Sequence, residues 1–286
     1  MQCFGPMSIP KPGGDGTKDR VTVPCGKCMG CLSNLRNDWS FRLKQELKKS
    51  ISSCFITLTY DDEHLVIKSL VKRDIQLFLK RLRQAIVKGN HRVTDVEKVA
   101  KEAGKVHKLR YLIVGEYGPV TNRPHYHGVM FNIPVSLKNE LDRIWGLGFV
   151  HQGSVTDASI HYTTEYMINK GAAADEGIEP QFMLMSRKPG IGFNYLEDTE
   201  LWHKRNKHFY VVNAGGFKQR MPRYYESKVF EKMEIEENSI SLRNLMDKRE
   251  EVEFKALMKL EVNPFISIEE RKKAYIMNTK SKNKKL

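Results

Sequence analysis

The sequence lacks the features of a membrane or secreted protein. No apolar stretch among its 286 residues approaches the ~20 residues that span a bilayer. The first residues, MQCFGPMSIPKPGG, have neither the basic start nor the apolar core of a secretory signal. The five cysteines are an odd number with four near the N-terminus, a poor framework for disulfides. We therefore expect a cytoplasmic protein with no membrane partner.

Acidic residues are outnumbered. The chain has 48 Lys and Arg against 34 Asp and Glu, a formal net charge of +14. Such a surplus favours a polyanionic partner, because neutralising phosphates releases condensed counterions. A basic but otherwise ordinary surface explains the same number, so charge alone does not establish nucleic-acid binding.

The hydrophobic patterning predicts an α+β fold. Apolar residues recur every three or four positions in two long segments and alternate in several short ones. Helices are expected over 34–50, 70–88, 136–145 and 158–171, and strands over 54–60, 109–118, 125–133 and 148–155. The turn-rich PVTNRP between the second and third strands predicts a hairpin. This order suggests a central antiparallel sheet with flanking helices packed on one side.

Composition divides the chain into three predicted parts. Residues 1–33 form a Cys-rich N-terminal arm, residues 34–225 the main domain, and residues 226–286 a basic helical C-terminal tail.

The stretch RPHYHGVMF carries two histidines, His125 and His127, at strand spacing. Residues i and i+2 share one face of a strand, so both imidazoles point to one place. Glu116 lies on the partner strand of the predicted hairpin and is the best candidate for a third metal ligand. Two histidines and one carboxylate leave coordination positions open, which suits Mg²⁺ or Mn²⁺ acting on a phosphate. The alternative is a hydrogen-bonded pair of histidines without a metal.

A second pattern, HYTTEYMINK, places Tyr162, Tyr166 and Lys170 at i, i+4 and i+8 on one helix face. A core face would favour Leu, Ile or Phe instead. A phenol is a competent nucleophile once its proton is accepted or its pKa is lowered, and a nearby ammonium favours the phenolate. Together with the metal site, these residues predict in-line attack of a tyrosine on a phosphodiester, which nicks and later rejoins nucleic acid.

FITLTY, VGEYG, RPHYHGVMF and YTTEYMINK together resemble the HUH endonuclease superfamily. With VPCGKCMGC, MSRKPGIG and MPRYY, nearly the whole chain is similar to the rolling-circle replication initiators of gokushoviruses, small single-stranded DNA phages. The resemblance implies an RRM-like nuclease domain and a replication initiator that nicks single-stranded phage origin DNA through a 5′-phosphotyrosine. It also implies host DNA polymerase and helicase as partners, and a first motif at residues 55–60 for fold and DNA contact. Tyr126 stands where many members have a smaller aliphatic residue, and it is expected to face away from the metal.

The family pattern leaves the nucleophile open between two tyrosines. Y-x3-Y resembles initiators whose tyrosines alternate, whereas a single nucleophile is expected at Tyr166, which is closer to the lysine. A related transposase or relaxase remains an alternative function. So does a non-catalytic, zinc-containing RRM-like protein, although no paired stacking aromatics are seen in its predicted strands.

The cysteines form a separate pattern. PCGKCMGC contains Cys25, Cys28 and Cys31, and Cys3 completes a possible Cys₄ zinc site. An iron–sulfur cluster or three reduced structural thiols are the alternatives. Cys54 begins an apolar strand and is expected to be a buried thiol. In the later SRKPGIG loop, phosphate contact and a solvated linker are both consistent with the sequence.

Overall fold

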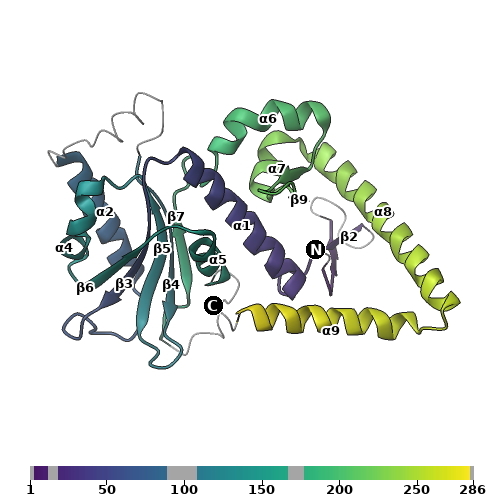
Figure 1. The fold of residues 1–286 in the computed structure, drawn as a ribbon, viewed down its shortest axis with the longest axis horizontal. Coiled ribbons are helices and arrows are strands. Elements are labelled where there is room, and N and C mark those ends of the chain that lie inside the picture. Colours follow the sequence, from purple (N-terminus) through teal and green to yellow (C-terminus); the bar gives the residue numbers. More distant parts are fainter. Residues whose placement is uncertain (1–2, 12–18, 89–107, 167–176, 284–286) are drawn as a thin grey trace. The chain divides into compact units, whose positions relative to one another are not determined.

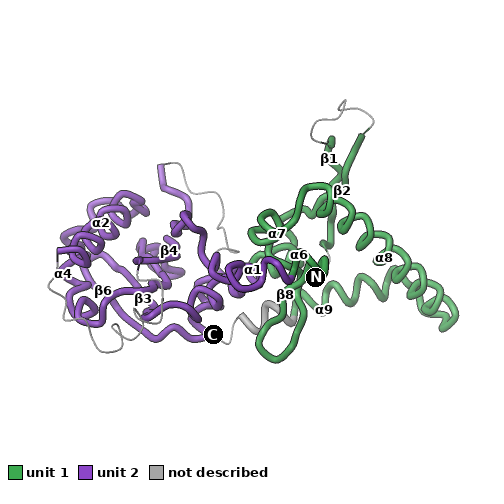
Figure 2. Tube along the Cα trace, turned by 90° about the horizontal axis from the view of Figure 1, so that it is seen from above, with its two compact units in different colours: residues 1–35, 203–286 green, residues 36–202 purple. Residues whose placement is uncertain are grey.

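The computed structural model describes residues 3–11, 19–88, 108–166 and 177–283. Two compact units are distinguished by colour in Figure 2. Residues 36–202 form one, and residues 1–35 together with 203–286 form the other. The polar insert GNHRVTDVEKVAKEAGK lies outside the described residues.

Residues 36–202 are built on a five-stranded sheet (Figure 1). Its strands are β3 (Ser53–Tyr60), β4 (Arg110–Tyr117), β5 (Pro124–Phe131), β6 (Gly148–Gly153) and β7 (Phe182–Met185). Their order is β6-β3-β5-β4-β7, and every neighbouring pair is antiparallel. The predicted α+β class, the four predicted strands and the β4–β5 hairpin are confirmed. The fifth strand, β7, was not predicted.

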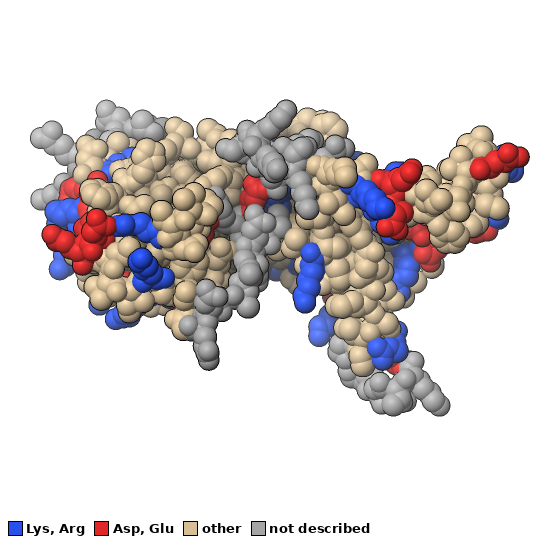
Figure 3. Space-filling model, turned by 90° about the horizontal axis from the view of Figure 1, so that it is seen from below, with Lys and Arg blue, Asp and Glu red and all other residues tan. Residues whose placement is uncertain are grey.

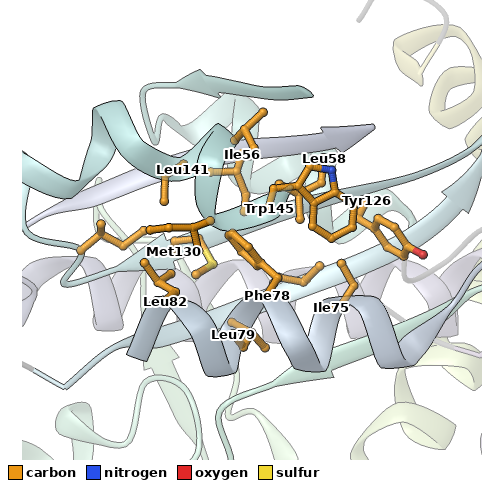
Figure 4. Close-up of a cluster of buried hydrophobic side chains, with 14 of the residues drawn as sticks. Ile56, Leu58, Ile75, Phe78, Leu79, Leu82, Tyr126, Met130, Leu141 and Trp145 are labelled. Carbon is orange, nitrogen blue, oxygen red and sulfur yellow. The ribbon is translucent and has the colours of Figure 1, made fainter. Parts of the chain in front are cut away.

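The first face of the sheet is covered by the helices that connect its strands. The 17 residues of α2 (Lys72–Lys88) join β3 to β4, and the 3-10 helix η1 (Val135–Glu140) with α4 (Leu141–Trp145) joins β5 to β6. Burial along β3 alternates strictly, so every second side chain enters this core. Figure 4 shows Phe78 of α2 and Trp145 of α4 against Leu58, Tyr126 and Met130 of the sheet.

A second core covers the opposite face. Trp39 and Leu43 of α1 (Met29–Lys49) and Ile160 of α5 (Asp157–Tyr166) pack with Val129 and Phe131. The prediction that the helices pack on one side is therefore wrong. The physical reason is that β4 and β5 are buried almost throughout, so both faces of these strands are apolar and both need a cover.

The other unit combines two short hairpins with long helices. The hairpins are β1 (Met7–Pro10) with β2 (Arg20–Val23), and β8 (Tyr210–Val212) with β9 (Lys218–Arg220). The helices are the end of α6 (Asn194–Asn206), α7 (Arg223–Val229), α8 (Lys232–Lys259) and α9 (Pro264–Asn283). The helices expected toward the C-terminus are thus present. Over the described residues, no helix has the length and apolar character needed to cross a membrane.

Candidate active site

The register of the β4–β5 hairpin brings three candidate metal ligands together. Glu116 is the direct cross-strand partner of His125, and His127 lies two residues further on the same face. Oε1 of Glu116 is 2.6 Å from Nε2 of His125 and 3.1 Å from Nε2 of His127. Glu116 and His127 are buried and His125 is half-buried. The three donor atoms all lie within 4.8 Å of one another, so they could hold a metal ion.

Each imidazole is oriented by a contact at its other nitrogen. Nδ1 of His125 is 3.1 Å from the carbonyl oxygen of Arg123. A carbonyl only accepts, so this Nδ1 carries the hydrogen and donates it. Nδ1 of His127 is 2.9 Å from Oγ1 of Thr57, its cross-strand partner on β3. Both contacts direct an Nε2 atom toward Glu116, which is the arrangement that such hydrogen-bond partners give to metal-binding histidines.

The charges of the site support each other. Burial disfavours the Glu116 carboxylate, but hydrogen bonds from His125 and His127 outweigh it and lower the pKa of Glu116. Burial also disfavours a charged His125, and the bond to Glu116 outweighs it and raises the pKa of His125. In the absence of a cation, a proton thus holds His125 and Glu116 together. A divalent ion would replace that proton, so two imidazole nitrogens and one carboxylate oxygen fit it chemically.

The helix α5 brings a phenol to the same place. The hydroxyl of Tyr162 lies 3.4 Å from Nε2 of His127. Phe55 stacks on the His127 ring, with centroids 5.7 Å apart and planes 16° from parallel. The Tyr162 ring meets both of these rings nearly edge-on. The α5 backbone is described as far as Tyr166, but the side chain of Tyr166 and the whole of Lys170 lie outside the described residues.

The opposite face of β5 carries Tyr126, as predicted. Its side chain is fully buried in the first core, and its hydroxyl lies 2.8 Å from that of Tyr60. The Tyr126 hydroxyl also accepts a hydrogen bond of 2.9 Å from the backbone N–H of Val71. The bulky aromatic therefore fills the core and does not approach the candidate metal ligands.

Two residues of the site were not predicted individually. Thr57 and Phe55 belong to the stretch 55–60 that the family resemblance gives to fold and DNA contact, yet both touch His127. The available signal was alternation: Phe55, Thr57 and Thr59 share the strand face opposite to the buried Ile56 and Leu58. Without the β3–β5 register, nothing in the sequence assigns Thr57 to one histidine.

The other unit gathers four cysteines, Cys3, Cys25, Cys28 and Cys31, with all Sγ atoms within 4.8 Å. Sγ of Cys28 is 3.8 Å from that of Cys3, and Sγ of Cys25 is 4.0 Å from that of Cys31. All four are reduced, as is the buried thiol of Cys54 on β3. The predicted grouping of Cys3 with the C-x2-C-x2-C pattern is present, and it could hold a metal ion.

Backbone N–H groups point at these sulfur atoms. The N–H of Phe4 donates to Sγ of Cys28, and the N–H of Cys25 to Sγ of Cys3. Burial opposes ionisation of Cys28, but the bonds from backbone N–H groups and neighbouring thiols lower its pKa to about 6. Burial instead raises the pKa of Cys31 to about 12. The cluster therefore already favours one thiolate, the protonation state that a metal requires.

Comparisons with known proteins give the family. The model of the Replication-associated protein ORF2 family matches residues 53–171, the stretch from β3 through α5 that holds Glu116, His125, His127 and Tyr162. Replication-associated protein ORF2 of Spiroplasma virus 4 is 30% identical over 267 residues, 84% of this chain and 77% of the relative. Replication-associated protein VP4 of Bdellovibrio phage phiMH2K is 32% identical over 258 residues, 79% and 76% of the two chains. Replication-associated protein ORF4 of Chlamydia phage 1 is 25% identical over 227 residues, 71% and 52%.

No solved structure matches the chain. The sequence matches nevertheless cover most of its length, and they agree on one role. The chain belongs to the family of phage replication-associated proteins, which confirms its resemblance to the rolling-circle replication initiators of microviruses.

Proposed function

We propose that the protein is an endonuclease that nicks single-stranded phage origin DNA and later rejoins it. The observation that carries this proposal is the Tyr162 hydroxyl, 3.4 Å from Nε2 of His127 at the edge of the Glu116, His125 and His127 group. The strands β6-β3-β5-β4, with α2 and α4 as connections, follow the β-α-β-β-α-β order of the split βαβ motif. That topology supports the RRM-like HUH fold.

The three ligands would hold Mg²⁺ or Mn²⁺. When bound, the cation polarises the scissile phosphate and neutralises charge that develops on its oxygens. Thr57 and the Arg123 carbonyl keep the imidazoles turned toward the ligand position. Phe55 and Tyr162 line the exposed side of His127 with aromatic rings, which suit stacking with an unpaired base.

The chemistry is a transfer that conserves the phosphodiester bond. The phenolic oxygen attacks phosphorus, and the bond from phosphorus to the 3′ oxygen breaks. The tyrosine becomes linked to the 5′ phosphate, and the proton lost by the phenol ends on the freed 3′ hydroxyl. The reverse reaction with a second 3′ hydroxyl rejoins the strand. In the host cytoplasm, a host polymerase would extend the 3′ end behind a host helicase.

The nucleophile is Tyr162, Tyr166 or both in turn, with Lys170 supporting the phenolate. Tyr162 is supported by its place beside His127. Tyr166 is supported by the helical spacing that puts it one turn further along α5.

Covalent trapping tests the proposal. The protein is incubated with labelled origin oligonucleotide and Mn²⁺, and the adduct is detected by its altered migration and mapped by mass spectrometry. We expect an adduct that is lost when Tyr162 and Tyr166 are both replaced by Phe, and kept in the control Tyr224→Phe. Loss in only one single variant assigns the nucleophile. Absence of an adduct with every divalent metal would contradict the proposal, and hairpin or transfer-origin DNA as the preferred substrate would favour a transposase or relaxase.

For the second group we propose structural zinc, held by Cys3, Cys25, Cys28 and Cys31. Thiolate-only tetrahedral sites are typical of structural Zn²⁺, and the pattern of N–H bonds to sulfur stabilises the required thiolates. Metal analysis of the purified protein is expected to give one zinc per chain, lost in Cys28→Ser but retained in Cys54→Ser. Iron with visible absorption would identify a cluster instead.

A further inference from the structure

A cavity of about 570 Å³ opens where α2, the start of β4 and the loop after β7 meet. Its floor is apolar and is formed by Leu79, Leu109 and Leu184. Four exposed cationic side chains stand around it: Arg83, Lys108, Arg187 and Lys188. We name this cavity the basic cleft.

The charge of the basic cleft is not balanced locally. Neither Asp nor Glu lines it, and none of its four exposed cations forms an ion pair with a carboxylate in the part of the chain that is described. The guanidinium of Arg83 lies 5.6 Å above the ring of Tyr111, which holds it at the wall. Elsewhere the charges are mixed: in Figure 3, Lys and Arg stand in small groups, several beside Asp or Glu.

A buried ion pair fixes the loop that carries two of the cations. Nε of Arg110 donates to Oε1 of Glu46 at 2.7 Å, and both side chains are buried. The same guanidinium donates to the carbonyl oxygens of Pro189 and Gly190, at 2.6 and 2.9 Å. The N–H of Gly192 completes the set by donating to Oε2 of Glu46. The loop SRKPGIG is therefore anchored at its glycine half.

This anchoring has two consequences for charge. Glu46 neutralises Arg110, so Arg110 acts on the loop rather than on a ligand. Arg187 and Lys188, which precede the anchored residues, stay exposed at the mouth of the cleft. Because the backbone is already held, little conformational entropy is lost when these two side chains bind a ligand.

The basic cleft is separate from the candidate active site. Arg110 and Glu116 lie six residues apart on β4, or roughly 20 Å at ~3.3 Å per residue. The α2 residues of the cleft also come from the helix that covers the other face of the sheet. A phosphate in the cleft thus belongs to a different part of the substrate from the phosphate that is cut.

We propose that the basic cleft binds consecutive backbone phosphates of a nucleic-acid segment distant from the cleaved bond. This inference rests on the proposed function only for the identity of the DNA. One phosphate would leave most of the four positive charges unneutralised, whereas successive phosphates of a strand neutralise them together. Arg83 and Arg187 supply planar forks for phosphate oxygens, and Lys108 and Lys188 supply point charges.

The test compares two charge-matched double variants. Arg83→Gln with Lys188→Gln removes two cations of the cleft, and Lys48→Gln with Lys80→Gln removes two exposed cations that do not line it. Binding of a labelled single-stranded oligonucleotide longer than the nick site is measured by anisotropy in EDTA, across a salt series. Because each phosphate contact contributes ~0.7 to the slope of log K against log salt, we expect the cleft variant to lower that slope by about 1.4. The control is expected to keep the wild-type slope.

Three outcomes decide the proposal. Equal slopes for the two variants, with unchanged melting temperatures, would overturn it. A melting-temperature shift by inorganic phosphate or a mononucleotide that needs Arg83 and Lys188, with an unchanged salt slope, would make the cleft a small-anion site and also overturn it. Weaker DNA binding by the cleft variant supports it even where the tyrosine variants reveal no adduct, because EDTA removes the chemistry from the assay.

Discussion

Thr57 offers the sharpest test of how the candidate metal site is oriented. Replacing it by Val keeps the β-branched shape but removes the hydroxyl that lies 2.9 Å from Nδ1 of His127. The imidazole then loses the partner that fixes its tautomer and its ring direction. Removal of such a partner typically lowers metal affinity 10–100-fold, or ~1.4–2.8 kcal/mol.

The same strand provides a matched control. Thr59 is also half-buried on this face and stands opposite His125, but its hydroxyl makes only a 3.4 Å contact to the carbonyl of Phe149. Thr59→Val is therefore expected to leave affinity within about twofold of the wild type, since no metal ligand loses a contact.

Calorimetric titration with Mn²⁺ measures both variants, and urea unfolding checks that their stability is similar. The lost hydroxyl contact of Thr57 is worth about 1 kcal/mol of folding free energy at most, so the two effects separate. Equal affinities of Thr57→Val and wild-type protein would refute the orienting role. A loss of the same size in Thr59→Val would refute it as well, because the effect would then be general to the strand.

Three further predictions concern the scaffold. Arg110→Ala leaves the Glu46 carboxylate buried without its partner and should lower the free energy of unfolding by ~3–5 kcal/mol in urea denaturation. His203 is fully buried, donates from Nδ1 to a backbone carbonyl at 2.9 Å, and has a pKa that burial lowers. The unfolded state therefore takes up the extra proton as pH falls below ~6.5, so stability should drop by up to ~1.4 kcal/mol per pH unit, and His203→Gln should reduce that slope. A Cβ on Gly128 would lie 2.8 Å from a side-chain carbon and 3.0 Å from a carbonyl oxygen of β4, so Gly128→Ala should cost ~1–3 kcal/mol, whereas Gly153→Ala, with 3.9 Å to its nearest neighbour, should be nearly neutral by thermal melting.

The parts of the site that sequence could predict are those set by local geometry. Glu116 and His125 were paired correctly because a short turn joins their strands and fixes the register. The outward position of Tyr126 followed from the strand period of two. Helical spacing likewise predicted that α5 would carry Tyr162, although not that its hydroxyl would meet His127.

Features set by distant parts of the chain were missed. The strand β7 has four residues and pairs with β4, about seventy residues earlier, with no hairpin to announce it. The ion pair of Glu46 with Arg110 joins residues 64 positions apart. No pattern in one sequence specifies such contacts. The predicted boundaries at residues 34 and 225 and the role of Lys170 stay predictions.

Strand β5 shows why the site depends on the core. Its alternate side chains serve the two faces of the sheet: His125 and His127 point to the candidate metal position, while Tyr126 and Met130 fill the first core. A slip by one residue would exchange the faces, burying both imidazoles in apolar packing. The Tyr126 hydroxyl opposes that slip, because it is bonded to Tyr60 and to the backbone before α2. The bulky residue between the two histidines therefore fixes the register on which metal binding depends, although it lies on the other side of the sheet.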